Sequence, residues 1–389
     1  MKKKVLIYYR YFGLTLGGGE YLPLRFIAAL QRTCEVTLAL DWTDHFERAV
    51  ELMGVPIDLD RLKVEKVMPE NYHATTCNPL QSIYRFRRLR RLASDADVCI
   101  SLANIMDFGR SAHHFILCID LGDEAFADHV CGTVRTSVPF LKRVRRFLEA
   151  SVLRPLLGMR TRRAVIEDPG EHIYPNSLYT QSLIEGFYRV ANSSVFYPPT
   201  LFEPAKVETE RHPLRVVYLG RIAPAKRVDE IVTIVERARA ISSKDIELHL
   251  GGHLDAGTFG RELEARVREL PWISIVGELF GDEKSRFLSS GTFAIHAMRT
   301  EAFGISITEY LKAGLVPIVP DEGGACEVVS DAELSFGSVD EAARILSRLA
   351  TDHEFRESKR ASCLKRAAEF SKEAYEKRER ELLAAIVGE

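Results

Sequence analysis

Short apolar runs alternate with segments of helical character along most of this chain, and this alternation restricts the fold more than any other feature. In the first half, apolar runs cover residues 5–9, 35–40, 98–102 and 115–119, and a helical segment covers residues 20–31. Runs this short are typical of strands that are buried on both faces. Their alternation with helices predicts a parallel sheet covered by helices on both sides.

The same alternation starts again in the second half, after a proline-rich segment. Residues 197–213 contain four prolines and little periodicity, and we interpret them as a linker between domains. Expected strands and helices then alternate at 214–219, 228–241, 246–250, 261–270 and 273–276. A chain of 389 residues is long enough for two domains. The sequence therefore predicts an α/β protein with two doubly wound, Rossmann-like domains.

Composition and charge exclude several classes of protein. The formal net charge of -2 argues against a dedicated nucleic-acid binder. No apolar stretch reaches the roughly 18–20 residues of a membrane span, and the apolar run at the N-terminus is too short for a signal peptide. The seven cysteines are scattered without a C-x-x-C pair, so neither a zinc site nor a disulfide framework is indicated. A cytoplasmic protein with reduced thiols is the expected class.

The segment E-A-F-G-I-S-I-T-E at residues 301–309 is the strongest indication of function. Its two carboxylates, Glu301 and Glu309, bracket Gly304 and the expected start of a helix. Carboxylates accept hydrogen bonds from sugar and ribose hydroxyls, and a helix N-terminus offers N–H groups to phosphate. A capping box between Ser306 and Glu309 would explain the same residues without any ligand.

The surroundings of this segment favour a ligand. An apolar run at 294–298 precedes it, a helix is expected at 306–313, and Gly314 lies where a helix-ending glycine belongs. The next expected strand covers residues 315–320. Both glutamates therefore follow the carboxyl end of a strand, which is where open parallel sheets bind their ligands.

Two further loops could contact phosphate. The loop G-R-I-A-P-A-K at 220–226 leaves the first strand of the second domain and carries Arg221 and Lys226, two cations that suit a diphosphate leaving group. Arginine and lysine are also common on solvated loops. The second loop, Gly17–Gly19, follows the first strand and either approaches a phosphate or forms a plain turn.

Taken together, these residues resemble the GT-B glycosyltransferases of family 4, a retaining family that includes many mannosyl- and glucosyltransferases. The resemblance covers nearly the full length of the chain. Besides the glutamate pair with Arg221 and Lys226, which is its specific part, it rests on G-G-G-E at 17–20, N-S-L-Y-T at 176–180, Y-P-P at 197–199 and G-G-A-C-E at 323–327.

The resemblance implies a GT-B architecture, in which two Rossmann-like domains face each other across a cleft and close around the donor. It implies an acceptor-side domain at residues 1–198 and a nucleotide-sugar-binding domain at residues 199–371. The helix at residues 372–389 would cross back to the first domain. That helix has an apolar stripe suited to such packing, formed by Tyr375, Leu382, Leu383 and Ile386.

The resemblance also implies roles for the side chains. Glu309 would hold the nucleotide ribose, and Glu301 would contact hydroxyls of the transferred sugar. Arg221 and Lys226 would bind the diphosphate. Glu301, Arg221 and Lys226 are therefore the expected catalytic residues.

Backbone groups complete the expected donor site. The N–H groups of Gly304, Ile305 and Ser306 would contact phosphate or sugar, and Gly18 and Gly19 would approach the phosphates from the first domain. Family members need no metal, because cationic side chains and helix dipoles stabilise the leaving group. The expected co-substrate is a GDP- or UDP-sugar, and no other cofactor is expected.

One departure from the family concerns the acceptor side. Many relatives carry a histidine after the strand that corresponds to residues 115–119, and here Asp120 occupies that place, with His113 and His114 upstream. Asp120 is either an acceptor contact or a helix-capping aspartate. The segment 296–305 resembles eukaryotic mannosyltransferases that extend lipid-linked oligosaccharides, which hints at GDP-mannose. His296 itself is expected to be a satisfied strand residue.

Two basic regions suggest a membrane surface. Residues 141–163 place apolar residues at helical spacing with lysines and arginines on the other face, and residues 85–91 read R-F-R-R-L-R-R. Basic amphipathic helices can bind anionic lipid surfaces. The alternative is a solvated helix whose apolar side packs into the first domain.

The leading hypothesis is a retaining glycosyltransferase that moves a hexose, such as mannose, from a nucleotide-diphosphate sugar to a glycan or lipid-linked acceptor. It would be cytoplasmic, with peripheral contact at the inner face of the membrane. A sugar-nucleotide epimerase or phosphorylase of the same architecture is one alternative, and a non-catalytic nucleotide-sugar-binding protein is another. The residues leave open the sugar, base, acceptor, linkage and oligomeric state.

Overall fold

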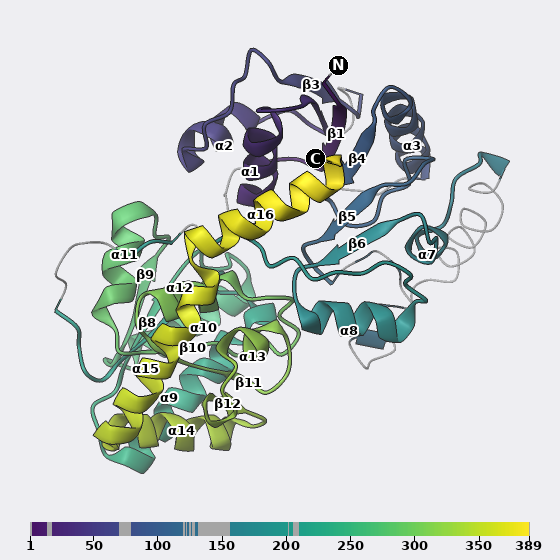
Figure 1. Cartoon of the computed structure of the whole chain (residues 1–389). Coiled ribbons are helices and arrows are strands. Elements are labelled where there is room, and N and C mark those ends of the chain that lie inside the picture. Colours follow the sequence, from purple (N-terminus) through teal and green to yellow (C-terminus); the bar gives the residue numbers. More distant parts are fainter. Residues whose placement is uncertain are drawn as a thin grey trace. The chain divides into compact units, whose positions relative to one another are not determined.

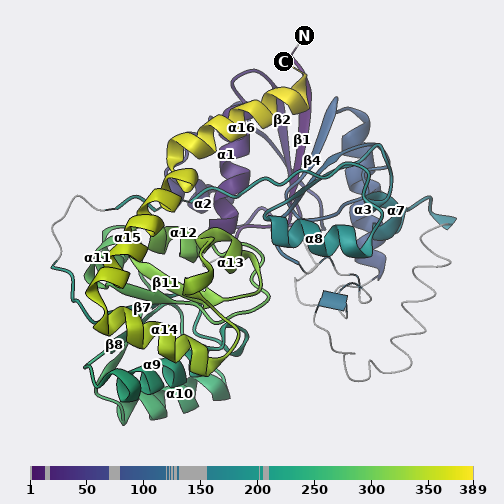
Figure 2. The same ribbon diagram turned by 60° about the horizontal axis from the view of Figure 1, so that its bottom comes forward.

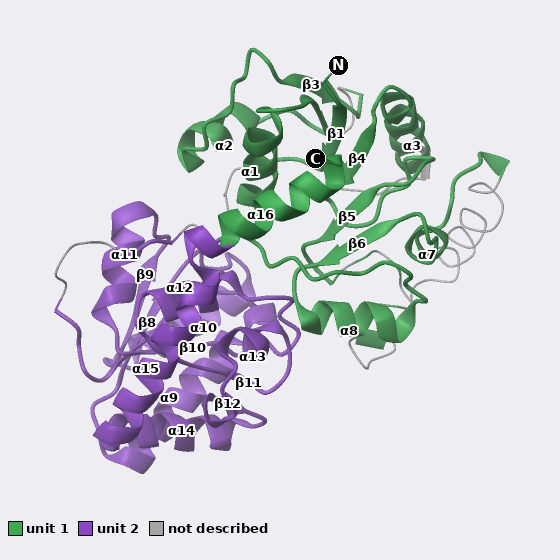
Figure 3. Ribbon diagram, in the orientation of Figure 1, with its two compact units in different colours: residues 1–199, 375–389 green, residues 200–374 purple. Residues whose placement is uncertain are grey.

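The chain forms two α/β units, each built on its own parallel sheet (Figure 1). The computed structural model describes residues 2–13, 18–69, 79–119, 121, 123, 126, 129–130, 156–200, 202–204 and 210–388. Unit 1 consists of Met1–Pro199 with Tyr375–Glu389, and unit 2 of Thr200–Ala374 (Figure 3). Each unit is described by itself.

The sheet of unit 1 has six described strands in the order β3-β2-β1-β4-β5-β6. Every pair of neighbours in it is parallel. The strands are β1 (Lys4–Tyr9), β2 (Glu35–Leu40), β3 (Lys63–Lys66), β4 (Val98–Ser101), β5 (His113–Ile116) and β6 (His172–Pro175). The helices with described bounds are α1 (Tyr21–Leu30), α2 (Phe46–Met53), α3 (Pro79–Ser94), α7 (Arg162–Ile166) and α8 (Leu178–Phe187), and the 3-10 turn η1 covers Gly18–Glu20.

The sheet of unit 2 repeats this topology, with the described order β12-β11-β10-β7-β8-β9 and parallel pairing throughout. Its strands are β7 (Arg215–Leu219), β8 (Glu247–Gly251), β9 (Ile273–Gly277), β10 (Phe293–Ile295), β11 (Val316–Pro320) and β12 (Ser335–Phe336). Its helices are α9 (Val228–Ser242), α10 (Thr258–Arg268), α11 (Gly281–Ser290), α12 (Ile305–Lys312), α13 (Gly324–Val329), α14 (Val339–Thr351) and α15 (His353–Ala367). Helix α14 packs against α9 (Figure 2). The predicted pair of doubly wound parallel sheets is confirmed.

The last helix, α16 (Lys372–Val387), packs into the core of unit 1. Tyr375, Leu383 and Ile386 are buried there among residues of α1 and β2, which accounts for the apolar stripe seen in the sequence. An ion pair of 2.6 Å between Arg25 of α1 and Glu379 fixes the helix further.

One local prediction was wrong in detail. The expected strand at 115–119 is β5, which covers His113–Ile116 and so includes both histidines. The boundary between the two units, at Pro199 and Thr200, falls within the predicted linker 197–213. The described part of this segment also packs on unit 2: the Thr200 hydroxyl lies 2.7 Å from that of Thr308, and the Lys312 ammonium donates to the carbonyl of Phe202 at 2.9 Å. Residues 200–204 therefore pack on α12 where they are described.

Candidate functional site

The residues predicted to bind a donor lie at the carboxyl edge of the unit 2 sheet. Strand β10 pairs directly with β7, so the loops that leave these two strands are neighbours. The first loop carries Arg221 and ends in the 3-10 turn η3 (Pro224–Lys226), and the second carries Glu301. The ammonium of Lys226 lies 2.5 Å from Oε2 of Glu301. Two predicted site residues that are 75 positions apart in sequence are thus in contact.

Glu301 is held in its ionised form. Its side chain is only 17% exposed. Burial raises the pKa of this carboxyl, but contact with the His296 ring and the charge of Lys226 lower the pKa more, from 4.5 to about 2. At neutral pH Glu301 is therefore a carboxylate that accepts hydrogen bonds, and it has no proton to donate.

The loop that carries Glu301 is fixed by two glycines of the next turn. The N–H of Gly324 donates to the carbonyl of Glu301 at 2.7 Å. Gly323 has a φ of 91°, and a Cβ atom there would collide with the carbonyl of Arg299. A Cβ on Gly324 would collide with the carbonyl of Ala302. The close approach of the two backbones requires both glycines.

Helix α12 begins at this loop with an open N-terminus. Its N-cap is Gly304, with a φ of 94° that favours glycine, and no side chain caps it. Among the described residues, no acceptor is found for the N–H groups of Ile305 and Ser306. The capping box of Ser306 and Glu309 is therefore absent, and these N–H groups stay available to an anion.

Glu309 lies one turn further along α12 and is also paired. Its side chain is 8% exposed, and its Oε1 lies 2.8 Å from the ammonium of Lys284 on α11. Lys284 could not be predicted from the sequence, because nothing in G-D-E-K-S-R-F marks this lysine as part of a site. Each of the two glutamates thus forms an ion pair with one lysine.

Arg221 differs from the two lysines. Its side chain is exposed, and no hydrogen bond or ion pair joins its guanidinium to a described residue. Its backbone is fixed, since the Tyr218 hydroxyl donates to the Arg221 carbonyl at 2.8 Å. The hydroxyl of Tyr310, on α12, accepts from the N–H of Leu219 at 2.7 Å and so ties α12 to the end of β7. Neither tyrosine was singled out in the sequence.

The expectation for His296 was wrong. The residue follows β10 directly, and its side chain is 2% exposed. Its Nε2 lies 3.3 Å from Oε2 of Glu301, but the ring is not aligned for a hydrogen bond, and neither ring nitrogen has a hydrogen-bond partner among the described residues. A buried ring without partners beside a carboxylate is not a satisfied strand residue.

The expected site residues of unit 1 are only partly described. Gly18 and Gly19 form the 3-10 turn η1 with Glu20, ahead of α1. A Cβ atom on Gly19 would meet nothing within 4 Å, so packing does not require that glycine. Gly17 and Asp120 lie outside the described residues.

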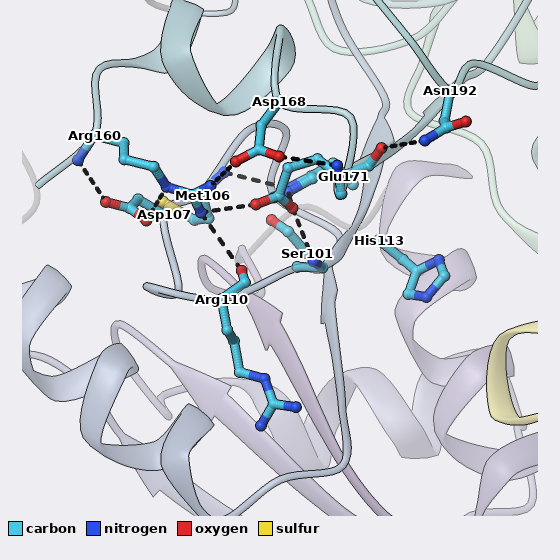
Figure 4. Close-up of polar contacts among 12 residues, drawn as sticks. Ser101, Met106, Asp107, Arg110, His113, Arg160, Asp168, Glu171 and Asn192 are labelled. Atoms are coloured by element: carbon cyan, nitrogen blue, oxygen red, sulfur yellow. Dashed lines mark hydrogen bonds and ion pairs between the residues drawn. The ribbon is translucent and has the colours of Figure 1, made fainter.

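The two basic regions contain fewer free charges than the sequence suggests. Residues 141–155 lie outside the described part. Arg160 contacts three carboxylates at 2.7–3.0 Å, those of Asp107, Asp168 and Glu171 (Figure 4). It is therefore part of a polar network and is not available to a surface partner.

Helix α3 carries the other basic region. Arg85 pairs with the fully buried Asp41 at 2.7 Å, and Arg88 pairs with Glu65 at 2.6 Å. Arg87 and Arg91 are exposed, and so is Tyr84 on the same face.

The described residues contain neither a metal-binding cluster nor a membrane span. Within them, no three histidine, cysteine, aspartate or glutamate side chains are grouped so that they could hold a metal ion. None of the described helices combines the length and hydrophobicity of a membrane span.

Comparison with known sequences places unit 2 in context. Residues 201–370 match the family model "Glycosyl transferases group 1". Curated relatives include a protein named GDP-Man:Man(3)GlcNAc(2)-PP-Dol alpha-1,2-mannosyltransferase from Candida glabrata. It is 27% identical over 170 residues, which are 38% of this chain and 32% of the relative. The protein of the same name from Xenopus laevis is 30% identical over 173 residues, 39% of this chain and 34% of the relative. The matched part is about a third of the length of these relatives.

Comparison with solved structures extends over the whole chain. The Anabaena protein HepE was solved in complex with UDP and glucose. It matches this chain with a TM-score of 0.65 at 15% identity, and the match covers 98% of this chain and 100% of HepE. WaaG, a glycosyltransferase involved in lipopolysaccharide biosynthesis, has a TM-score of 0.67 at 14% identity, with 99% and 100% covered. Residues 201–370 thus match the group 1 glycosyl transferases, within a chain whose two sheets together have the GT-B fold.

Proposed function

We propose that this protein is a retaining glycosyltransferase that transfers a hexose from a nucleotide-diphosphate sugar to a glycan or lipid-linked acceptor. The observation that carries the proposal is the arrangement at the carboxyl edge of the unit 2 sheet. The carboxylates of Glu301 and Glu309, the open N-terminus of α12 and the cations Arg221 and Lys226 come from neighbouring elements of one unit. This unit is also the part that matches the group 1 family.

The chemistry of these groups fits the parts of a nucleotide sugar. The buried Glu309 accepts hydrogen bonds from the two ribose hydroxyls, and the ionised Glu301 accepts them from the hexose. Arg221, Lys226 and the free N–H groups of α12 stabilise the diphosphate as negative charge develops on it. The roles of Gly18 and Gly19 at the phosphates, and of Asp120 at the acceptor, remain predictions.

We propose that transfer retains the anomeric configuration, as the resemblance to the family implies. With a pKa of about 2, Glu301 is a carboxylate that cannot act as an acid for the leaving group. In our proposal the acceptor attacks on the face that the diphosphate leaves, and the departing phosphate takes the proton of the acceptor. Product analysis by NMR tests this, and an inverted linkage would contradict it.

The relatives favour GDP-mannose as donor and a lipid-linked glycan as acceptor. The curated relatives carry GDP-mannose and a dolichol-linked glycan in their names. The solved HepE complexes contain UDP, UDP-glucose or glucose, so a UDP-sugar is the second donor to test.

A donor panel tests the proposed function. We expect one nucleotide sugar among GDP-mannose, UDP-glucose and ADP-glucose to raise the melting temperature, because a ligand of the native state stabilises it. The same donor should be hydrolysed slowly without acceptor, and hydrolysis should persist in EDTA. Absence of both effects with every donor would contradict the proposal. Binding without turnover would favour the non-catalytic alternative, and loss of activity in EDTA would contradict metal independence.

We also propose peripheral contact with a membrane, where a lipid-linked acceptor would lie. Arg87 and Arg91 are exposed one turn apart on α3, and the exposed Tyr84 lies on the same face. Arginine binds anionic headgroups, and tyrosine is enriched at membrane interfaces. Arg85 and Arg88 of the same helix are paired with carboxylates, so we assign the membrane contact to Arg87 and Arg91.

Liposome binding tests this surface. Each basic residue near an anionic membrane contributes about 1 kcal/mol, so Arg87→Ser with Arg91→Ser should lower the partition onto vesicles containing phosphatidylserine about thirtyfold at low salt. Arg268→Ser with Arg286→Ser, which removes two exposed arginines of unit 2, is the matched control and should have little effect. Wild-type protein that does not sediment with the vesicles at low salt would exclude the membrane contact.

A further inference from the structure

We propose that His296 is a positioning residue, which holds the Glu301 carboxylate on the transferred sugar when Lys226 binds the diphosphate. This inference rests on the proposed function, and it assigns a role to a residue that the sequence led us to expect as a satisfied strand residue. Two observations carry it: Lys226 and His296 contact the same oxygen of Glu301, and the His296 ring has no hydrogen-bond partner among the described residues. The third step is that Lys226 would have to bind both Glu301 and the diphosphate.

Lys226 and His296 contact the same oxygen of Glu301. The Lys226 ammonium lies 2.5 Å from Oε2, and the Nε2 atom of His296 lies 3.3 Å from it. The lysine therefore makes the shorter contact with this oxygen, and the imidazole makes the longer one. Both groups also lower the pKa of Glu301 against the effect of burial, which raises it.

Burial of the His296 ring destabilises the fold, and packing alone does not explain why a histidine lies there. The residue is fixed by its backbone, whose N–H donates to the carbonyl of Ile318 at 3.1 Å. Its two ring nitrogens are buried and have no hydrogen-bond partner among the described residues. A buried polar group without a hydrogen-bond partner destabilises a protein. A residue that served only to fill the core would be apolar, as the neighbouring Ile295 and Ala297 are.

Lys226 cannot keep its short contact with Glu301 and also bind a diphosphate fully. A diphosphate offers several charged oxygens and attracts the ammonium away from a single carboxylate. Glu301 would then be a largely buried carboxylate without a close partner, which is unfavourable. The Nε2 atom already lies 3.3 Å from Oε2, so a small rotation of the ring or of the carboxylate aligns the Nε2–H for a hydrogen bond. His296 thus takes over Oε2 at the step when Lys226 leaves it, and Oε1 stays free for a sugar hydroxyl.

Two substitutions with different reach separate this role from packing. Glutamine places its amide nitrogen near the position of Nε2 and can still donate to Glu301, whereas asparagine is shorter and cannot reach. We expect His296→Gln to keep at least about a third of the wild-type kcat/KM and His296→Asn to lose about tenfold or more, because only asparagine loses the hydrogen bond to the charged carboxylate. Ile295→Val, in the adjacent buried position, is the control for a simple loss of stability.

Binding of GDP and of GDP-mannose, or of the corresponding pair that the donor panel selects, locates the effect. Because His296 supports Glu301 once Lys226 has left it, His296→Asn should weaken binding of the nucleotide diphosphate modestly. Because Glu301 also contacts the sugar, the same variant should weaken binding of the nucleotide sugar about tenfold more than that. Ile295→Val should lower the melting temperature without changing this ratio.

The outcomes distinguish the inference from the proposed function. If wild type binds and uses a donor while His296→Asn matches it, or while both ligands weaken equally, His296 has no positioning role. Equal activity of the glutamine and asparagine variants would also overturn it. If wild type neither binds nor uses any donor, the proposed function itself fails.

Discussion

Replacing Glu301 by alanine is expected to lower kcat/KM by at least about a hundredfold while the protein stays folded. A hydrogen bond to a charged group is worth about 1.5–3 kcal/mol, and about 1.4 kcal/mol corresponds to a factor of ten in rate. A carboxylate that accepts two sugar hydroxyls therefore accounts for about 3 kcal/mol or more. The fold should survive, because Glu301 lies on a loop and its carbonyl, which the Gly324 N–H contacts, is unchanged.

Steady-state kinetics with the donor from the panel check this prediction, and circular dichroism checks the fold. Glu262→Ala is the matched control, since Glu262 is an exposed glutamate of α10 in the same unit. A folded Glu301→Ala variant with near-normal rates would remove Glu301 from the site.

Replacing Lys226 by alanine is the second large effect we expect. Removal of one group that stabilises charge in the transition state lowers kcat by about 10²–10³. Lys226 is expected to act on the diphosphate, so the variant should also bind the nucleotide diphosphate itself more weakly. This separates Lys226 from His296, whose loss should weaken the nucleotide sugar more than the nucleotide diphosphate. Lys244→Ala removes an exposed lysine of unit 2 and serves as the control.

The Lys226 variant also has a stability signature that depends on pH. In the native protein the pKa of Glu301 is depressed from 4.5 to about 2; burial opposes this shift, and His296 and Lys226 cause it. A carboxyl whose pKa is lowered in the native state stabilises the fold at pH values above its ordinary pKa. That stabilisation is lost as the pH falls toward 2. Wild type should therefore exceed Lys226→Ala in free energy of unfolding by more at pH 7 than at about pH 3, as measured by urea denaturation. A difference independent of pH would contradict the ion pair.

The two sheets could be predicted because strands buried on both faces require continuous apolar runs, which are visible in sequence. The bounds of β5 could not be predicted from the sequence. His113 and His114 belong to that strand because His113 stacks on His172 at 4.7 Å between ring centroids and His114 contacts Glu171 at 2.9 Å. These partners come from β6 and the loop before it, more than 50 residues away, so a local pattern cannot show that two histidines fit inside a buried strand.

The site was predictable where the strand order alone decides it. Arg221, Lys226 and Glu301 follow the carboxyl ends of strands, and the pairing of β10 with β7 brings their loops together. Lys284 and Tyr310 could not be found in this way, because their partners depend on how α11 and α12 pack. His296 was visible but misjudged, since sequence shows that a histidine follows a strand and cannot show that its ring has no partner.

A crystal structure of the protein with the donor selected by the panel tests the central claim most directly. The account predicts that the ribose hydroxyls donate to the Glu309 carboxylate and that a diphosphate oxygen lies within hydrogen-bond distance of the Lys226 ammonium, which has moved from Glu301. A donor bound elsewhere on unit 2, with the Lys226–Glu301 contact still at 2.5 Å, would contradict it.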